Sequence, residues 1–331
     1  MALAIHPLGD ILQSCWHSQS TRAQGPEPFT PMSKPWEKLR CVLCCPEDSE
    51  PLEFCGAEYR CAACARRFPI QFGCIADLRP RSPQTIECAT NPQFARDYEV
   101  AFHRPLQGRN EALAWGAKEA VPLGWARKRE RQVRHVQRML EEEGSTVHTF
   151  CDFSAGAGYY TLALAPFFPV VLHCDLSCDS LLYASQKAEK MGIRNVAFLR
   201  IDYLRPPFVG KLDCAICMDS LERGEDHERR LLTAILRSLK PGGIGVVDFH
   251  NWWHNPARRL GLLPQNFGLN RSYTRREAEG LLRSCGVGEF RYLPFYQEFE
   301  PDGVASRMAQ VVLPPTRHLF LFKERRGDSS L

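Results

Sequence analysis

The sequence contains no apolar run that approaches the roughly 20 residues of a membrane-spanning helix, so we expect no membrane association. Its first ten residues lack a positively charged segment ahead of a sustained apolar core, so we expect no secretory signal and a cytoplasmic location. A large excess of one charge is also missing, since 42 Lys and Arg residues stand against 38 Asp and Glu residues. The net charge of +4 is well below the imbalance of a dedicated nucleic-acid-binding protein.

Cysteine, by contrast, is abundant, with 15 residues in a chain of 331. Such a count would indicate disulfides in a small secreted protein. Here, however, several cysteines lie inside apolar, strand-like runs, and others have the spacing of metal ligands. A reducing compartment is therefore favoured. The length of the chain allows one large domain and one small domain.

The stretch around which the rest of the chain is organised is residues 147–161, which read VHTFCDFSAGAGYYT. An apolar run leads through small residues into a segment with helical spacing, which predicts a strand, a tight turn and a helix. Glycine in such a turn lets the backbone approach a ligand, because it has no Cβ and tolerates positive φ. The turn lacks the Gly-Lys-Ser/Thr of a P-loop, and Thr161 stands where a dinucleotide-binding loop has its third glycine.

The motif that does fit is Asp-x-x-x-Gly-x-Gly, which resembles motif I of the class I S-adenosylmethionine (SAM)-dependent methyltransferases. In that family the turn holds the methionine part of SAM. The resemblance therefore assigns Asp152, Ser154, Gly156 and Gly158 to cofactor binding. Because the family usually has a glycine where Ser154 stands, we expect the first corner of the turn to be less tight here.

The second apolar run, residues 168–175, ends in Asp175 and is followed by Leu176. A carboxylate at this strand end can accept hydrogen bonds from both hydroxyl groups of a ribose, as it does in dinucleotide-binding folds. The alternative role of Asp175 is to cap the helix that follows. We assign Asp175 and Leu176 to the SAM site.

Two later runs end in the same way. Asp202 and Tyr203 close the third run, and the resemblance implies that the acid accepts the adenine amino group while the aromatic side chain flanks the ring. The alternative is a polar strand end with an exposed aromatic residue. Asp219 ends the fourth run and completes the predicted cofactor site.

The order of these runs resembles the methyltransferase class across residues 144–325. We expect an α/β fold with a Rossmann-like, seven-stranded sheet and helices on both faces, whose ligands bind outside the carboxyl ends of the strands. Later elements are expected as helices at 229–240 and 275–285, a turn at 241–243, and strands at 244–249, 290–296 and 318–322. The predicted division of the chain is a loosely ordered arm (1–38), a zinc ribbon (39–80), a linker with helices (81–143), the methyltransferase domain (144–325) and a tail (326–331).

Two Cys-x2-Cys pairs, separated by 16 residues, predict a structural zinc site. The predicted ligands are Cys41, Cys44, Cys61 and Cys64, whose thiolates can surround one tetrahedral Zn²⁺. Cys45 and Cys55 lie nearby as competing ligands and are left out of the predicted site. Residues 67–80 resemble the closing strand of the zinc ribbons that precede many bacterial methyltransferase domains and that begin the rRNA guanine methyltransferases.

The methyl acceptor is predicted to lie near residues 248–255, which read DFHNWWHN directly after the fifth strand. Methyl transfer to a protonated nucleophile needs a base, and His250, His254 and Asp219 are the candidate catalytic residues. Trp252 and Trp253 can wall the acceptor or face the sulfonium cation. Two alternatives stay open: a metal site formed by Asp248 with the two histidines, and a loop cap without a catalytic role.

We expect a SAM-dependent methyltransferase with a small-molecule acceptor. The alternative is an RNA base methyltransferase, indicated by the zinc ribbon and by the basic residues of segment 127–138, which surround an apolar stripe of Val133, Val136, Met139 and Leu140. A third hypothesis is a non-catalytic protein that binds SAM. The sequence leaves the oligomeric state open.

Overall fold

The computed structural model describes residues 35–82, 123–144, 147–221, 224–254, 260, 262, 271–296 and 303–324. Most of the predicted arm, most of the predicted linker and the tail lie outside these ranges. The end of the predicted arm is regular, because Pro35–Cys41 forms the 3-10 helix η1. Among the described residues, no helix has both the length and the apolar character needed to cross a bilayer.

The sheet of the large domain has the strand order β7-β6-β5-β8-β9-β11-β10. Its strands are β5 (Thr149–Phe153), β6 (Val170–Asp175), β7 (Val196–Arg200), β8 (Leu212–Leu221), β9 (Leu239–His250), β10 (Phe290–Phe295) and β11 (Arg317–Lys323). All pairings from β7 to β9 are parallel, whereas β11 runs antiparallel to both of its neighbours. The predicted Rossmann-like sheet is confirmed.

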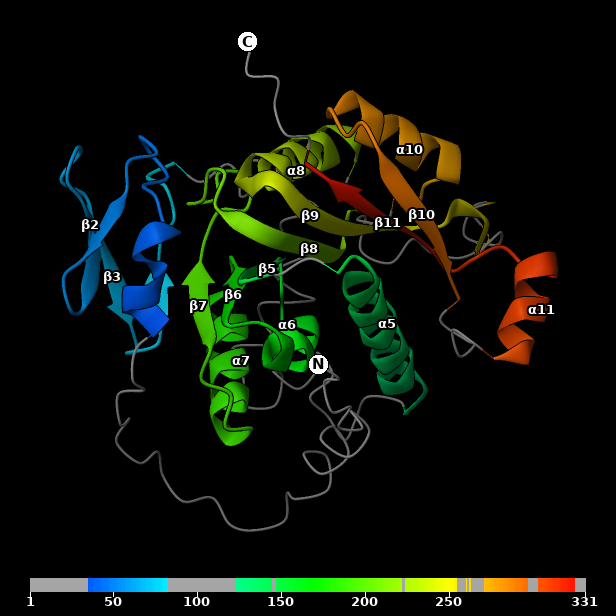
Figure 1. The fold of residues 1–331 in the computed structure, drawn as a ribbon, viewed down its shortest axis with the longest axis horizontal. Helices are drawn as coiled ribbons and strands as arrows, with labels where there is room; N and C mark the ends of the chain where they lie inside the picture. The colour runs from blue at the N-terminus through cyan, green and yellow to red at the C-terminus, as the bar shows by residue number, and fades with distance from the viewer. Residues whose placement is uncertain are drawn as a thin grey trace.

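Helices cover both faces of this sheet (Figure 1). One face carries α5 (Leu123–Glu142), α6 (Tyr159–Leu164), the short η3 (Ala165–Phe167) and α7 (Cys178–Lys190). The other face carries α8 (Glu225–Ser238) and α10 (Arg275–Ser284). Helix α11 (Val304–Val312), which the sequence did not predict, lies near the end of β10 and exposes apolar side chains.

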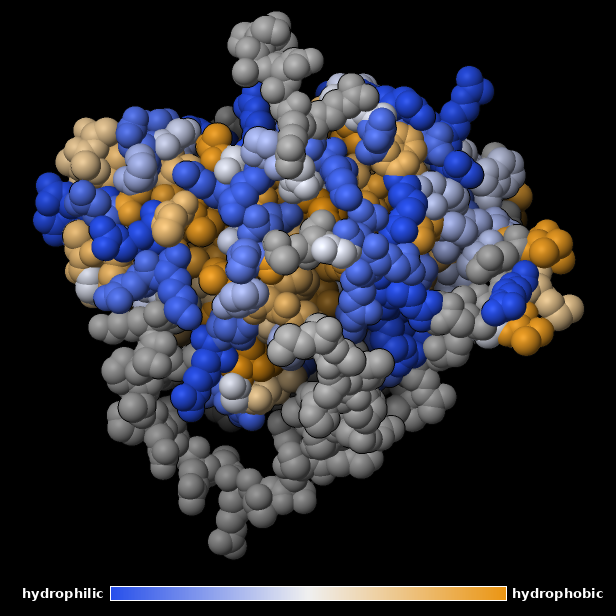
Figure 2. Space-filling model, in the orientation of Figure 1, coloured by the Kyte–Doolittle hydropathy of each residue, from blue (hydrophilic) through white to orange (hydrophobic). Residues whose placement is uncertain are grey.

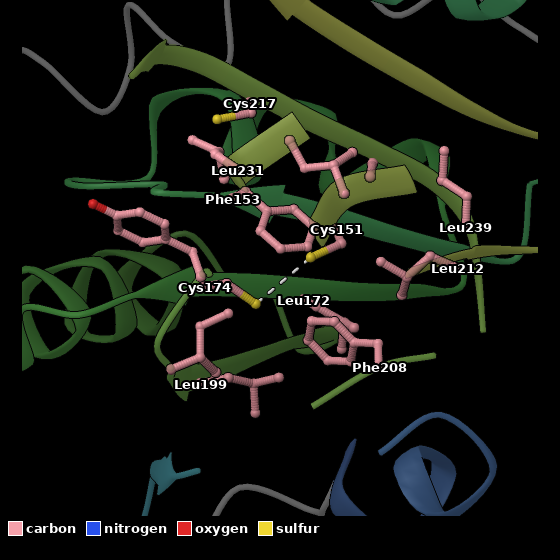
Figure 3. Close-up of a cluster of buried hydrophobic side chains, with 14 of the residues drawn as sticks. Cys151, Phe153, Leu172, Cys174, Leu199, Phe208, Leu212, Cys217, Leu231 and Leu239 are labelled. Carbon is pink, nitrogen blue, oxygen red and sulfur yellow. Dashed lines mark hydrogen bonds between the residues drawn. The ribbon is translucent and has the colours of Figure 1, made fainter. Parts of the chain in front are cut away.

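The core has two layers, one on each side of the sheet. Along β5, the side chain of Phe150 joins the layer under α6, while Cys151 and Phe153 join the layer under α8. Figure 3 shows the latter layer, in which the Cys151 and Cys174 sulfurs of neighbouring strands lie 3.6 Å apart. Strands buried on both faces read as continuous apolar runs, which is why their positions were visible in the sequence.

The small N-terminal domain is not separate from the sheet but extends it to 11 strands. Its strands are β1 (Leu52–Phe54), β2 (Glu58–Cys61), β3 (Arg67–Gln71) and β4 (Ile75–Asp77). β4 pairs in parallel with β7, so that Ile75 lies opposite Phe198, and the N–H of Leu78 donates to Arg200 O at 2.8 Å. The ribbon therefore lies against the strand that leads to Asp202.

Most predicted helices and strands are confirmed with shifted ends. The predicted apolar stripe of α5 is buried at Val133, Val136, Met139 and Leu140. The predicted turn at 241–243 was wrong in part, because β9 begins at Leu239 and continues through this segment. Leu239 pairs with Leu212 of β8, and Gly242 accommodates the irregularity with φ 81°. Pairing with a neighbouring strand overrides the local turn preference.

Candidate active site

The loop between β5 and α6 has three residues with left-handed backbone conformations, Ser154 (φ 57°), Gly156 (φ 54°) and Gly158 (φ 80°). The expectation of a looser corner at Ser154 is not met, because the serine adopts the conformation that glycine prefers. For a residue with a Cβ this conformation costs about 1–2 kcal/mol. A Cβ on Gly158 would lie 3.2 Å from Ala184 Cβ and 3.3 Å from Leu162 Cγ, whereas a Cβ on Gly156 would meet open space.

Asp175, at the end of β6, ties this loop to the next one. Its Oδ2 accepts a hydrogen bond from the Gly156 N–H, and its Oδ1 accepts one from the Ser177 N–H, both at 2.8 Å. The N-cap of α7 is Ser177, whose Oγ accepts from the Ser180 N–H at 3.3 Å. Asp175 therefore does not act as the side-chain cap, and its carboxylate holds two loops at the carboxyl edge of the sheet.

A buried chain of side chains beneath the loop links Asp152, Thr161 and His173. Asp152 Oδ2 lies 3.1 Å from the Thr161 N and 2.6 Å from Thr161 Oγ1. Thr161 Oγ1 lies 2.8 Å from His173 Nδ1, and His173 Nε2 lies 3.2 Å from the carbonyl oxygen of Gly156. Asp152 thus supports the loop from below.

The protonation of this chain follows from its partners. Burial lowers the pKa of His173 to about 3, so the ring is neutral near pH 7. The Gly156 carbonyl can only accept, so the ring proton is on Nε2 and faces that oxygen. The Thr161 hydroxyl donates to Asp152 Oδ2 at 2.6 Å, and its oxygen lies 2.8 Å from His173 Nδ1. Burial nevertheless raises the pKa of Asp152 to about 7.

The hydrogen-bonded side chains of Asp152, Thr161 and His173 predict an unusual pH dependence of stability. The pKa of Asp152 is about 7 in the folded state, against its ordinary value of 3.8. Asp152 therefore contributes fully to the free energy of unfolding below pH 4, and this contribution is lost as the pH rises through 7. Asp152→Asn, which imitates the protonated acid, should remove that loss. The wild type should lose roughly 2–4 kcal/mol relative to the variant between pH 4 and pH 8.

Urea unfolding of both proteins at several pH values measures this difference directly. His173 contributes the opposite slope between about pH 3 and 6.5, because its folded pKa is depressed, but it does so in both proteins and cancels in the comparison. Stability curves that run parallel from pH 4 to pH 8 would contradict the protonation of Asp152.

Three other predicted SAM-site residues lie around the ends of β6 and β7. Asp202 is fully buried, and its Oδ1 accepts from the Leu204 N–H at 2.9 Å. Tyr203 is also buried, with its ring edge-on to the His227 ring at a centroid distance of 5.9 Å. This corrects the alternative of an exposed aromatic at this strand end. The half-buried Leu176 accepts a hydrogen bond on its carbonyl from Arg200 Nε at 3.0 Å.

Asp219 belongs to a buried ion-pair network that the sequence did not predict. Arg317, at the start of β11, forms salt bridges with Asp219 and with Asp248, the latter at 2.5 Å. Asp248 Oδ1 also accepts from the Asp219 N–H at 2.7 Å, and its Oδ2 accepts from Gln132 Nε2 of α5 at 3.1 Å. Asp219 adopts φ 59°, so this strand end is both strained and ion-paired.

The predicted acceptor segment follows β9 and turns into the 3-10 helix η4 (Trp252–His254). His250 is half-buried at the end of β9, opposite Arg317, and its carbonyl accepts from the Tyr273 N–H at 2.8 Å. Trp252 is half-buried and Trp253 is 53% exposed. The side chain of His254 lies outside the described residues. Since Asp248 is already paired with Arg317, the alternative metal site at Asp248 is disfavoured.

Of the four predicted zinc ligands, the structure brings Cys61 and Cys64 together but places Cys41 and Cys44 elsewhere. Cys61 and Cys64 lie together, but the side chains that join them are Cys45 and Asp48. Cys41 is exposed at the end of η1, and Cys44 is buried against the loop after β7, where its N–H donates to Pro207 O at 2.8 Å. Cys55, the other competitor named from the sequence, is exposed and is not part of this group.

Arg317, His173 and Gln132 are the site residues that sequence reasoning missed. His173 is an isolated polar residue within an apolar run, which is a usable signal of a buried hydrogen bond. No local sequence pattern marks Arg317 or Gln132, because they contact Asp248 although they lie 69 and 116 positions from it in the sequence.

Comparison with known proteins bears on the fold that carries this site. Residues 150–243 match the family model described as a methyltransferase domain. The sequence matches no curated protein.

Magnesium protoporphyrin IX methyltransferase from Synechocystis PCC 6803, with bound SAH, is similar in structure. The TM-score is 0.50 and the sequence identity is 16%, over 70% of this chain and 97% of that one. A SAM-dependent methyltransferase from Clostridium acetobutylicum ATCC 824 has a TM-score of 0.46 and 15% identity over 70% of this chain and 98% of that one. Residues 150–243 thus match a methyltransferase domain, within a sheet of Rossmann-like fold.

Proposed function

We propose that this methyltransferase domain transfers a methyl group from SAM to a small-molecule acceptor. The observation that carries the proposal is the convergence of the Gly156 loop, Asp175 and Asp202 at the carboxyl edge of the parallel strands. That edge is where ligands bind in open sheets of this kind.

The residues present fit SAM. Open space lies over Gly156, so the loop backbone can approach the methionine part of the cofactor. The Asp175 carboxylate, already oriented by two backbone N–H groups, is placed to accept from ribose hydroxyls. Asp202 and Tyr203 would hold the adenine. When bound, SAM supplies a methyl group on a sulfonium, which is electrophilic without further activation.

The acceptor is proposed to bind between the SAM site and the segment after β9. His250 is the base we favour, because its backbone is fixed by Tyr273 and its ring is half-buried. Asp219 is less suited to this role, since a carboxylate paired with Arg317 is a weak proton acceptor. We assign Asp219 to positioning the strand end. His254 remains a second candidate base.

A small-molecule acceptor is favoured over RNA by the near balance of charge in the whole chain. The similar structure from Synechocystis belongs to an enzyme that, by its name, acts on magnesium protoporphyrin IX, which is not a nucleic acid. One observation favours the RNA alternative: Figure 2 shows hydrophilic residues gathered over α5. The sequence of this helix contains Arg131, Arg134 and Arg138, which are half-buried.

The test uses labelled SAM with a cell extract, divided into a small-molecule fraction, an RNA fraction and a ribonuclease-treated fraction. We expect label in the small-molecule fraction, unchanged by ribonuclease and strongly reduced with Asp175→Ala when SAM is below saturation. Label that depends on intact RNA would replace the small-molecule acceptor with the RNA alternative, which also predicts steep salt dependence. SAM binding without transfer in any fraction would support the non-catalytic hypothesis.

A further inference from the structure

The N-terminal ribbon contains a compact group of ligand atoms that differs from the one its Cys-x2-Cys spacing suggests. The sulfurs of Cys45, Cys61 and Cys64 and a carboxylate oxygen of Asp48 all lie within 4.8 Å of one another. Cys45 and Cys61 are buried, Cys64 is half-buried, and Asp48 is exposed. Three sulfurs and one oxygen therefore face a common centre at the surface of the ribbon.

Two residue pairs within the group, Cys45 with Cys64 and Cys61 with Asp48, have the spacing of ligands around one tetrahedral ion. Two sulfurs bound to Zn²⁺ at about 2.3 Å lie about 3.8 Å apart, and a sulfur and a carboxylate oxygen lie about 3.5 Å apart. The Cys45 and Cys64 sulfurs are 3.7 Å apart. The Cys61 sulfur lies 3.5 and 3.3 Å from the two Asp48 oxygens.

Two turns of the same construction present these ligands. The first is Cys45-Pro-Glu-Asp48 and the second is Cys61-Ala-Ala-Cys64, so Asp48 stands where a second cysteine would be expected. In the first turn the Glu47 N–H donates to the Cys45 sulfur, and in the second the Cys64 N–H donates to the Cys61 sulfur, both at 3.5 Å. Backbone N–H groups aimed at sulfur stabilise thiolate charge.

The residue that follows each turn adds an independent observation. Ser49 (φ 65°) and Ala65 (φ 58°) both have left-handed backbones directly after Asp48 and Cys64. A non-glycine residue adopts this conformation at a cost of about 1–2 kcal/mol. The same unfavourable conformation therefore occurs at equivalent places after both turns, as expected if the two turns serve one site.

Cys41 and Cys44 do not share this construction. Cys41 is the exposed last residue of η1, and Cys44 forms a bridge with Pro51 while donating its N–H to Pro207. The spacing of Cys41 and Cys44 therefore reflects the end of η1 and the contact of Cys44 with Pro207, and not a shared metal site. The first pair of candidate ligands is Cys45 and Asp48, in place of the predicted Cys41 and Cys44.

We propose that Cys45, Asp48, Cys61 and Cys64 bind one Zn²⁺ in a closed structural site with three sulfur ligands and one oxygen ligand. The three thiols release their protons to solvent as the metal binds. The site anchors the first turn against the methyltransferase domain, because Arg205, in the loop after β7, donates to Pro46 O at 3.0 Å and lies 3.6 Å from Glu47. The metal thereby supports the loop that follows Asp202.

The test measures metal per chain in the full-length protein purified under reducing conditions, and the absorption of the protein after replacement of zinc by Co²⁺. We expect one zinc per wild-type chain, its loss in Cys45→Ser and Cys61→Ser, and its retention in the matched control Cys41→Ser. Asp48→Cys should keep the metal and raise the sulfur-to-cobalt charge-transfer absorbance by about a third, because four thiolates replace three.

The Asp48→Cys variant also tests the site if the serine variants fail to fold, because it replaces one metal ligand with another and does not remove a ligand. Loss of zinc in Cys41→Ser together with retention in Cys45→Ser would overturn the proposed ligand set. An unchanged cobalt spectrum in Asp48→Cys would remove Asp48 from the site. A wild-type chain that takes up no zinc or cobalt would overturn the metal site itself.

Discussion

Replacing Arg317 with alanine is expected to lower the free energy of unfolding by about 3–5 kcal/mol. The Arg317 side chain is 6% exposed and bridges Asp219 and the fully buried Asp248. Without the guanidinium, the hydrogen bonds that Asp248 keeps from the described residues come from neutral donors, Gln132 Nε2 and the Asp219 N–H. A buried carboxylate without its cation is among the largest single costs that a substitution can cause.

Urea unfolding of Arg317→Ala measures this cost, and Arg291→Ala is the matched control. Arg291 also pairs with an acid, Glu142 at 3.0 Å, but its side chain is 39% exposed, so its loss should cost no more than about 1 kcal/mol. Arg317→Lys keeps the charge but not the planar fork that reaches both acids, and should fall between the two. Equal effects of the two alanine variants would show that the network at the end of β8 contributes little.

Replacing Asp175 with alanine is expected to weaken SAM binding about 10- to 100-fold, which corresponds to roughly 1.4–2.8 kcal/mol. Two effects add. The carboxylate that would accept from the ribose is lost, and the Gly156 and Ser177 N–H groups lose the acceptor that joins their loops. A loop that must become ordered on binding binds its ligand more weakly.

Calorimetric titration with SAM and with its demethylated product measures this effect. The matched control is Asp213→Ala, because Asp213 lies at the start of β8, the opposite edge of the sheet, and its Oδ2 accepts from the Thr149 N–H at 2.9 Å. That variant should be less stable but should bind SAM with unchanged affinity. Equal affinities of wild type and Asp175→Ala would rule out the role of Asp175, while a wild type that ignores both ligands would refute the proposed function.

The residues of the candidate site differ in how visible they were in the sequence. The strands, the Gly156 loop and the acids at the strand ends could be predicted, because a strand buried on both faces is an apolar run and its end is marked by the first polar residue. The sequence could not, however, tell apart the roles of these acids, which differ in their hydrogen-bond and ion-pair partners. Asp175 and Asp202 accept from backbone N–H groups, Asp152 supports the loop through Thr161, and Asp219 is paired with Arg317.

The proposed zinc ligands illustrate the same division between sequence and tertiary structure. Two pairs with the same spacing, Cys41-x2-Cys44 and Cys45-x2-Asp48, follow each other directly in the sequence, and spacing alone favoured the pair with two cysteines. Only the path of the chain separates them, because η1 and the contact with Pro207 turn Cys44 away from the group that Cys45 joins.

By itself, the sequence determined the order of the strands β5 to β11 and of most helices between them, the Rossmann-like class of the sheet and the place of the Gly156 loop, since all of these depend on residues close together in the chain. Tertiary structure alone decided that the ribbon extends the sheet through β4, that Cys45 and Asp48 rather than Cys41 and Cys44 lie beside the second cysteine pair, and that Arg317 neutralises two acids. The physical reason is that these features arise from the pairing of distant segments. Insertion of β11 between β9 and β10 brings Arg317 to Asp248, and no local pattern of residues encodes that neighbourhood.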